Sequence, residues 1–295
     1  MILDGVFPDG LNKAAAPDGV LCVGAGKTVY VGQLDVVDWH RHAVPVVVVG
    51  LAGKFELATH PGKRLRCRAA VVPAGVRHAL WVGGNPVAVF YPEPSLATLS
   101  DLTRLGGGWD AVGPVLVGQT AEVALFRGLY EDRTALSFAG EMLDDLVDFL
   151  RAGKGPPLLD PRVARIVDWL GRNPADLTPL AQLVKQNGLS VSRFLHLFSD
   201  EIGVPFRRFR IWNRLRAASS LALRGANLTD AAISAGFSDS AHFSRLHRAT
   251  FGVTPSYILS RLARAALQFE QATPKVARPT ARRVRRNSAR ALFRA

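Results

Sequence analysis

Hydrophobic and polar positions divide the chain into two parts with different periods. Between residues 20 and 91, short valine-rich runs alternate with glycine and proline: "VLCV", "TVYVG", "VPVVVVG", "FELA", "AAVVP" and "VAVFY". Apolar runs of this length, separated by turn residues, predict the strands of a small antiparallel barrel or sandwich. After residue 160 the apolar positions recur with helical spacing. The pattern therefore predicts an α+β multidomain protein, with a β-barrel followed by an all-α domain.

The segment between these parts contains one amphipathic helix and a breaker-rich stretch. In "EMLDDLVDFLRAG" the apolar residues Leu143, Leu146, Val147 and Leu150 share one helical face, which either packs on the barrel or forms a candidate dimer surface. The glycines at 106–108 predict a loop. We divide the chain into a barrel with following helices (1–152), a linker (153–160), a helical domain (161–262) and a basic tail expected to be disordered (263–295).

The helical part contains the same short stretch twice. "GLSVSRFLHLFSDEIGVP" begins at Gly188, and "GFSDSAHFSRLHRATFGVTP" begins at Gly236. An offset of 49 residues pairs Phe194 with Phe243 and Gly203 with Gly252. Each copy has a turn glycine, a serine that can cap the next helix (Ser190, Ser238), an amphipathic helix and a closing glycine. This order of parts predicts two helix-turn-helix units.

A long helix is predicted to join the two units. It would run from about residue 205 to residue 223 and measure about 28 Å at 1.5 Å per residue. Successive major grooves on one face of B-DNA lie ~34 Å apart, so one chain could place two recognition helices in adjacent turns.

The charge distribution favours a polyanionic partner for the C-terminal half. The chain has a net charge of +13, but residues 1–159 carry 14 basic and 16 acidic residues, a balance of −2. Residues 160–269 carry 15 basic and 7 acidic residues, and residues 270–295 carry 8 and 1. The positive charge therefore belongs to the predicted helix-turn-helix domain and the tail, which indicates double-stranded DNA.

The second unit carries a motif that identifies a family resemblance. Residues from about 160 to 262 resemble the DNA-binding domain of the AraC/XylS family of bacterial transcription regulators. The matching residues are Ala232, Gly236, Phe237, Phe243, Arg245, Arg248, Gly252, Thr254 and Pro255. Two positions depart from the family pattern: His247 stands where phenylalanine is usual, and Ile258 where arginine is common. The resemblance implies a transcriptional regulator that binds promoter DNA and is not an enzyme.

The resemblance also assigns base-contacting positions. In the first recognition helix they correspond to Ser192, Leu195 and His196, and in the second to Ser240, Ala241, Ser244 and Arg245. Arginine can bond guanine N7 and O6 together, so chemistry alone favours Arg245 as a base reader. Leu195 can offer only an apolar contact, for instance to a thymine methyl group.

Three histidines of the β-rich part form a second pattern. "WHRH" supplies His40 and His42, and "VPAGVRH" supplies His78. This layout resembles a cupin barrel, in which such histidines line the interior. Metal-binding cupins usually add a glutamate about five residues after the second histidine, and here "AVPVVVVG" contains no acid. We therefore expect an effector pocket without metal or another cofactor, although three imidazoles alone can hold a metal ion.

The remaining expectations concern partners and location. The family arrangement implies a small-molecule effector of unidentified chemistry, with RNA polymerase and a second copy of the chain as candidate partners. The longest mainly apolar run, 43–53, is about half of a membrane span, and Cys22 and Cys67 fit no C-x-x-C pattern. We expect a cytoplasmic protein with no membrane partner. The alternatives are a cupin metalloenzyme with a nucleic-acid-binding appendage and an architectural DNA binder driven by the arginine-rich tail.

Overall fold

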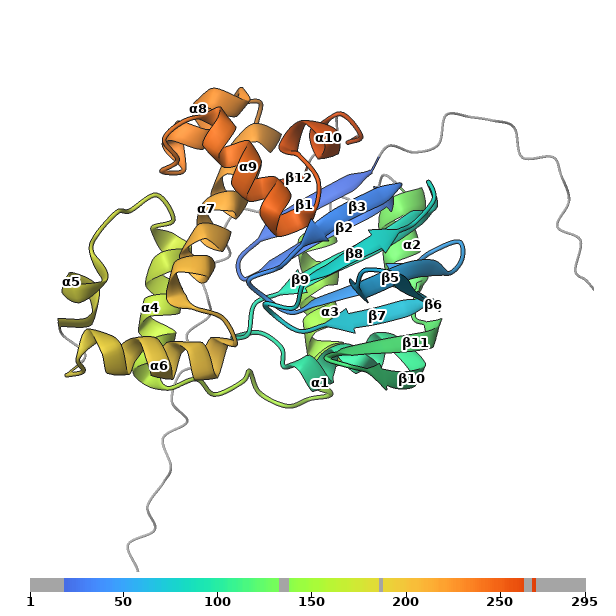
Figure 1. Cartoon of the computed structure of the whole chain (residues 1–295), viewed down its shortest axis with the longest axis horizontal. Helices are drawn as coiled ribbons and strands as arrows, with labels where there is room; N and C mark the ends of the chain where they lie inside the picture. Colours follow the sequence, from blue (N-terminus) through green and yellow to red (C-terminus); the bar gives the residue numbers. More distant parts are fainter. Residues whose placement is uncertain (1–18, 133–137, 186–187, 263–266, 269–295) are drawn as a thin grey trace, which may run out of the picture.

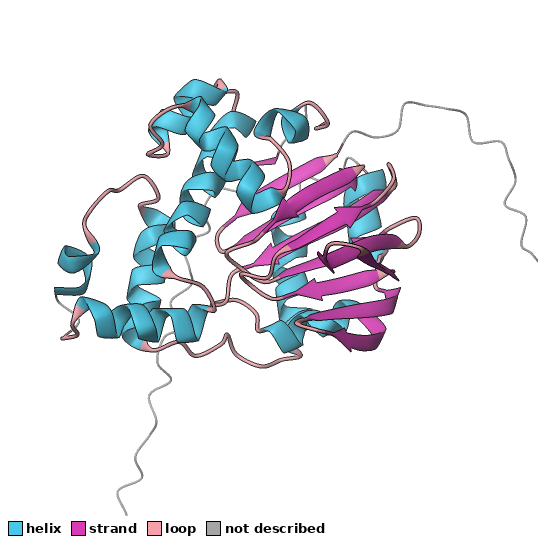
Figure 2. Ribbon diagram, in the orientation of Figure 1, coloured by secondary structure: helices cyan, strands magenta, loops and turns pink. Residues whose placement is uncertain are grey.

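The N-terminal domain consists of two facing β-sheets (Figures 1 and 2). The computed structural model describes residues 19–132, 138–185, 188–262 and 267–268. The larger sheet has the order β10-β11-β7-β4-β9-β2-β1-β12, and the smaller has the order β3-β8-β5-β6. The strands are β1 (Val20–Gly24), β2 (Lys27–Gln33), β3 (Val36–His40), β4 (Val46–Gly50), β5 (Phe55–His60), β6 (Lys63–Cys67), β7 (Ala69–Val72), β8 (His78–Trp81), β9 (Pro86–Pro92), β10 (Gly106–Val112), β11 (Val115–Ala121) and β12 (Leu267–Gln268).

The valine-rich strands bury both of their faces. In β4, Val46 and Val48 belong to the cluster between the two sheets, whereas Val47 and Val49 belong to a second cluster on the outer face of the larger sheet. Successive side chains of a strand point to opposite faces, so a continuous valine run fits a strand that is covered on both sides. The sequence pattern therefore identified the central strands of the larger sheet.

Helices cover the outer face of this sheet. They are α1 (Leu99–Leu102), the short 3₁₀ helix at Thr103–Leu105, α2 (Ala124–Glu131) and α3 (Ala139–Arg151). The apolar stripe of α3 is buried against the sheet, and Asp144 on the same helix pairs with Lys27 of β2. Because the stripe packs on its own domain, it is not free to form the dimer surface considered above.

The glycines at 106–108 begin a strand, so the predicted loop is wrong. A Cβ atom at Gly106 would lie 2.7 Å from Cζ2 of Trp109 and 2.8 Å from the carbonyl oxygen of Thr120. The indole of Trp109 folds back over the start of β10 and donates Nε1–H to the Gly106 carbonyl at 3.1 Å. Glycine serves close packing in a hairpin here, and this role has the same sequence signal as a loop.

The C-terminal domain is helical throughout its described residues, as predicted. Its helices are α4 (Pro161–Arg172), α5 (Leu180–Val184), α6 (Val191–Ile202), α7 (Phe206–Leu223), α8 (Leu228–Ser234), α9 (Ser240–Phe251) and α10 (Pro255–Leu259). Ser190 caps α6 by accepting a hydrogen bond from the Arg193 amide, as expected. The cap of α9 is Asp239 rather than Ser238, because the Asp239 carboxylate accepts from the His242 amide.

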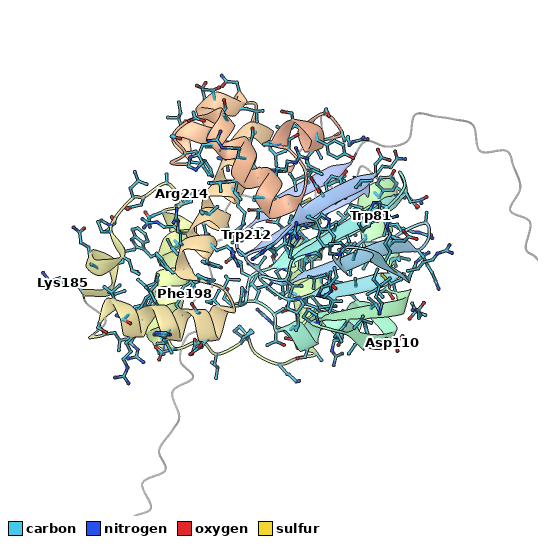
Figure 3. All side chains as sticks on the ribbon, viewed as in Figure 1. Trp81, Asp110, Lys185, Phe198, Trp212 and Arg214 are labelled. Atoms are coloured by element: carbon cyan, nitrogen blue, oxygen red, sulfur yellow. The ribbon has the colours of Figure 1, made fainter. Side chains whose placement is uncertain are left out.

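The two domains share one hydrophobic core. A single cluster joins the space between the sheets to the first helix-turn-helix unit, and Trp212 of α7 lies where the two meet (Figure 3). The Trp212 ring centroid is 5.6 Å from that of Tyr91 on β9, and its Nε1–H donates to Glu93 at 3.3 Å. Arg216, one turn further along α7, pairs with the same carboxylate and donates to the Gly24 carbonyl. The helical domain is thus anchored to the barrel by buried contacts.

Two further observations concern the tail and membranes. Residues 267–268 of the predicted tail pair in parallel with β1, and residues 263–266 and 269–295 lie outside the described part of the chain.

Among the described helices, none combines the length and apolar character of a membrane span.

The buried ion pair between the domains yields a stability prediction. Arg216→Met should lower the free energy of unfolding by about 3–5 kcal/mol, because Glu93 would remain buried without its cationic partner. The side chains of Arg216 and Glu93 are only 11% and 7% exposed. Arg248→Met is the matched control: it breaks the Arg248–Asp38 pair, whose side chains are 62% and 51% exposed, and should cost less than about 1 kcal/mol. Urea denaturation measures the free energy of unfolding of both variants. An equal decrease in the two would contradict a stabilising role for the buried Arg216–Glu93 pair.

Candidate DNA interface and effector site

The two recognition helices lie at opposite ends of α7 (Figure 1). Each turns its phenylalanines inward: Phe194 and Phe198 of α6 and Phe243 of α9 are buried. The predicted base-contacting residues lie on the other faces. The exposed members are Ser192, Leu195, His196, Ala241 and Arg245, and the half-buried members are Ser240 and Ser244. At 18 residues, α7 spans about 27 Å, which is of the order of one DNA turn.

The C-terminal half of α9 is attached to the barrel. The Asp38 amide of β3 donates to the Gly252 carbonyl at 3.1 Å, and the Arg41 amide donates to the Ala249 carbonyl at 3.3 Å. The Arg248 guanidinium pairs with the Asp38 carboxylate at 2.9 Å. The end of the second recognition helix therefore has backbone partners in the smaller sheet, while its first turns carry the exposed Arg245.

Gly252 permits this attachment. Its φ of +74° closes α9 in the left-handed conformation, which glycine adopts without strain. A Cβ atom there would lie 2.5 Å from Cγ1 of Val37 and 2.8 Å from Nδ1 of His40. Any side chain at 252 would therefore push the helix away from β3, in addition to straining the turn.

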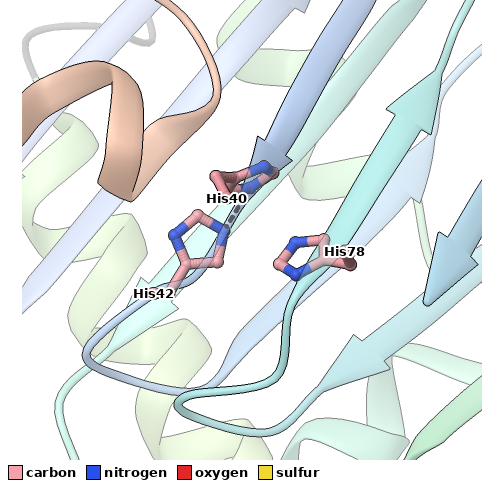
Figure 4. Close-up of side chains that lie close together, drawn as sticks. All are labelled: His40, His42 and His78. Atoms are coloured by element: carbon pink, nitrogen blue, oxygen red, sulfur yellow. Dashed lines mark hydrogen bonds between the residues drawn. The ribbon is translucent and has the colours of Figure 1, made fainter. Parts of the chain in front are cut away.

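The three predicted pocket histidines converge in the structure (Figure 4). His40 ends β3 and is paired in register with His78, the first residue of β8, while His42 follows two residues after His40. All three are buried, and one ring nitrogen from each lies within 4.8 Å of the others. The Nε2 atoms of His40 and His42 are 3.0 Å apart.

Backbone carbonyls determine where two of the ring protons sit. His40 Nδ1 lies 2.6 Å from the Asp38 carbonyl, and His78 Nδ1 lies 3.0 Å from the Val76 carbonyl. A carbonyl only accepts, so both Nδ1 atoms carry the proton and both Nε2 atoms present a lone pair. His42 must then donate Nε2–H to His40. Within the described residues, His78 Nε2 and His42 Nδ1 make no hydrogen bond.

Burial keeps these imidazoles neutral. Removal from water lowers the pKa of His78 to about 4, although the hydrogen bond to the Val76 carbonyl acts in the opposite direction. The same desolvation, together with repulsion from the neighbouring histidines, holds the pKa values of His40 and His42 well below the usual range. Near neutral pH the cluster is a set of uncharged nitrogen donors.

A cavity adjoins the histidines at the junction of the two domains. It contains about 60 Å³ of space, and His40 and His42 are part of its wall. The sheets contribute apolar residues, including Tyr30, Val89 and Tyr91. The helical domain closes the other side with Arg216, Ser219, His247, Phe251, Val253 and Ile258.

Sequence reasoning did not place these helical residues at the pocket. His247 and Ile258 depart from the AraC/XylS sequence pattern, and both line the cavity. For Arg216 and Phe251 the sequence carried no such signal, since their role depends on how the domains pack.

Comparisons with known proteins match the helical domain first. Residues 183–261 match the family model described as a helix-turn-helix domain. The chain is 33% identical over 102 residues to the HTH-type transcriptional regulator RipA of Corynebacterium glutamicum, covering 34% of this chain and 31% of RipA. It is 22% identical over 232 residues to the probable transcriptional regulator LumQ of Photobacterium leiognathi, covering 74% and 90%. It is 26% identical over 144 residues to the arabinose operon regulatory protein of Escherichia coli K12, covering 48% and 49%.

Solved structures match the arrangement of both domains. An apo variant of ToxT from Vibrio cholerae superposes with a TM-score of 0.54 at 16% identity, covering 81% of this chain and 99% of ToxT. ToxT with a bound unsaturated fatty acid gives a TM-score of 0.52 at 15% identity, covering 82% and 98%. These likenesses show a shared two-domain fold.

The buried His247 predicts a loss of stability in acid. Burial lowers its pKa to about 4, whereas an unfolded histidine titrates near 6.5. Stability from the neutral ring is complete above pH 6.5 and is lost as the pH falls towards 4, because the unfolded chain binds the proton more readily. At pH 5, His247 alone should lower the free energy of unfolding by ~2 kcal/mol, and the histidine cluster should lower it further.

His247→Phe tests this assignment, because phenylalanine keeps an aromatic ring at this position and carries no group that titrates. Between pH 7.5 and pH 5, the free energy of unfolding measured by urea denaturation should fall by ~2 kcal/mol less in the variant than in the unmodified chain. The exposed His60 supplies the control, because His60→Gln should leave the difference unchanged. An identical acid loss in the His247 variant and the parent chain would contradict the prediction.

Proposed function

We propose that this chain is an AraC-type helix-turn-helix DNA-binding regulator, and that it changes its occupancy of promoter DNA when a small effector binds between its domains. The cavity described above carries the proposal. Its wall combines strands of the barrel with the end of α9, so a ligand there contacts the sensor and the second recognition unit together. If the barrel and α9 can pack in two ways, a ligand that binds one arrangement more tightly shifts the equilibrium towards that arrangement.

The relatives support this assignment of roles. RipA, LumQ and the arabinose operon protein are all named as regulators. ToxT, which shares the fold, has been solved with an unsaturated fatty acid and with a naphthyl-butenoic acid. We infer that the barrel of this chain is likewise its effector-binding domain, acting in the cytoplasm where promoter DNA and RNA polymerase are found. Dimerisation, if it contributes, would use a surface other than the buried stripe of α3.

On the DNA side, we infer that α6 and α9 read two neighbouring major-groove segments. The exposed faces that carry Ser192, Leu195 and His196, and Ala241 with Arg245, supply the contacts, with Ser240 and Ser244 at the edge of the second face. The first face offers one apolar and two polar side chains, whereas the second contains an arginine that can bind guanine at two points. The second unit should therefore contribute more discrimination between bases.

Selection of bound sequences from a random DNA pool tests the two-groove arrangement. The purified chain at near-physiological salt should enrich a motif with two informative blocks about one helical turn apart. A chain lacking residues 271–295 should retain this motif with a smaller salt dependence, because the tail contributes only phosphate contacts. An unenriched pool, with binding lost on removal of the tail, would favour the architectural DNA binder.

Arg245→Ala should weaken binding to the selected site by ~1–3 kcal/mol and relax the preference at one base pair. Arg64→Ala removes the same charge from the exposed surface of the barrel and should leave affinity and preference unchanged. Fluorescence anisotropy with a panel of single-base variants of the site measures both effects. A uniform loss on every sequence would instead make Arg245 a phosphate contact.

A further inference from the structure

We propose that the barrel itself contacts DNA, and that Arg41 and Arg77 at one corner of it bind the phosphate backbone between the two groove segments read by α6 and α9. The inference rests on the proposed function, because it needs both recognition helices on one duplex. It adds a contact surface outside the helix-turn-helix units, and this surface fits the DNA backbone rather than a base sequence.

The barrel corner consists of residues 38–42, where β3 ends, and residues 74–77, which precede β8. The Gly75 amide donates to the His42 carbonyl at 2.9 Å and holds the two segments together. Figure 1 shows β3 beside α9. The corner is therefore a fixed part of the barrel at its junction with the helical domain.

The barrel corner contacts the C-terminal ends of both recognition helices. The Arg41 amide donates to the Ala249 carbonyl of α9 at 3.3 Å. A Cβ atom at Gly203, which closes α6, would lie 3.8 Å from Cβ of Ala74. The corner therefore bridges the ends of the two helices that α7 holds about one DNA turn apart.

The exposed face of α9 continues onto the barrel corner. Arg245 and Arg248 are three residues apart, so their side chains are neighbours on the helix surface. The Arg248 guanidinium pairs with the Asp38 carboxylate at 2.9 Å. Beside this pair, the Arg77 guanidinium lies 4.8 Å from the ring centroid of Trp39, which supports it from below. A duplex that contacts Arg245 therefore meets this part of the barrel next.

The corner carries positive charge that has no partner on the protein. Its two segments contain Arg41, Arg77 and one acidic residue, Asp38, and Arg248 of α9 already neutralises that carboxylate. Arg41 and Arg77 are exposed, and within the described residues their side chains form no ion pair. The planar guanidinium group is suited to pairing with phosphate oxygens.

The opposite side of the barrel is acidic. The exposed surface of α3 carries Glu141, Asp144, Asp145 and Asp148. This helix covers the outer face of the larger sheet, whereas β3 belongs to the smaller sheet, so the two lie on opposite sides of the sandwich (Figure 1). The barrel therefore repels DNA on the α3 side and attracts it at the corner, although residues 1–159 have a net charge of −2 (14 basic, 16 acidic).

DNA offers a matching surface at this place. Between neighbouring major-groove segments on one face of B-DNA lies a minor groove bordered by a phosphate strand on each side. Arginines that bridge the ends of the two recognition helices are placed to reach these phosphates. Each such contact releases about 0.9 counterion, so at about 0.15 M salt it is worth about fivefold in affinity relative to 1 M salt.

The salt dependence of binding to the selected DNA site provides the first test. Arg41→Gln and Arg77→Gln should each weaken binding about fivefold at about 0.15 M salt and reduce the slope of log Kd against log salt by about 0.9. The loss should be the same on every single-base variant of the site, because phosphates carry no sequence. Arg66→Gln, which removes an exposed arginine from the far edge of the same sheet, should change neither quantity.

Circular dichroism verifies the fold of each variant, including the double variant. Unchanged Kd and slope in the folded double variant, on a site that the parent chain binds, would overturn this inference and leave the proposed function standing. A parent chain that selects no DNA site would overturn the proposed function, and this inference with it.

DNA cleavage from a tethered reagent locates the contact directly. Cys22 and Cys67 are fully buried, so a cysteine introduced by Arg41→Cys can be labelled selectively with an iron–EDTA chelate. On the selected site, cleavage should occur between the two informative blocks, and the same label introduced by Arg66→Cys should not cleave there. Cleavage by the Arg41→Cys conjugate only outside the two blocks, or none from a conjugate that binds the site, would overturn the contact.

Discussion

The backbone contact between the end of α9 and β3 determines how the rest of the molecule can work. Two amide–carbonyl hydrogen bonds hold the second recognition helix to the edge of the sensor, and Gly252 brings the two backbones close enough to form them. The pocket wall and the environment of the histidines depend on this attachment, because Phe251 and Val253 line the pocket and Gly252 lies against His40. The domains therefore do not behave as independent units joined by a tether.

Local patterns were sufficient to predict six strands of the N-terminal half and the helical character of the C-terminal half. Five of the six runs became strands of the larger sheet, where apolar side chains are covered on both faces, and "FELA" became β5 of the smaller sheet. The repeated stretch became α6 and α9 with their closing glycines, because caps and turns depend on neighbouring residues in the chain. The histidine triad also came together as predicted, since the register of β3 and β8 places His40 opposite His78.

Features that depend on distant packing were not predictable from local patterns. Glycines at 106–108 look the same whether they form a loop or make room for Trp109, and only the fold distinguishes these roles. Ser238 and Asp239 are both good caps, and the choice between them follows from where α9 begins. The position of His247 in the cavity wall required knowledge of how one domain closes the other.

The pocket formed by both domains also has a consequence for how such proteins can diversify. The breaker-rich stretch at residues 153–160 lies between the barrel with its helices and the helical domain, where recombination could exchange one part for another. Yet a barrel exchanged at that point would lose one side of its pocket, because Arg216, His247 and Phe251 lie in the helical domain and would come from a different protein. New specificities in this architecture should therefore arise by coordinated substitution on both sides of the pocket more readily than by shuffling whole domains.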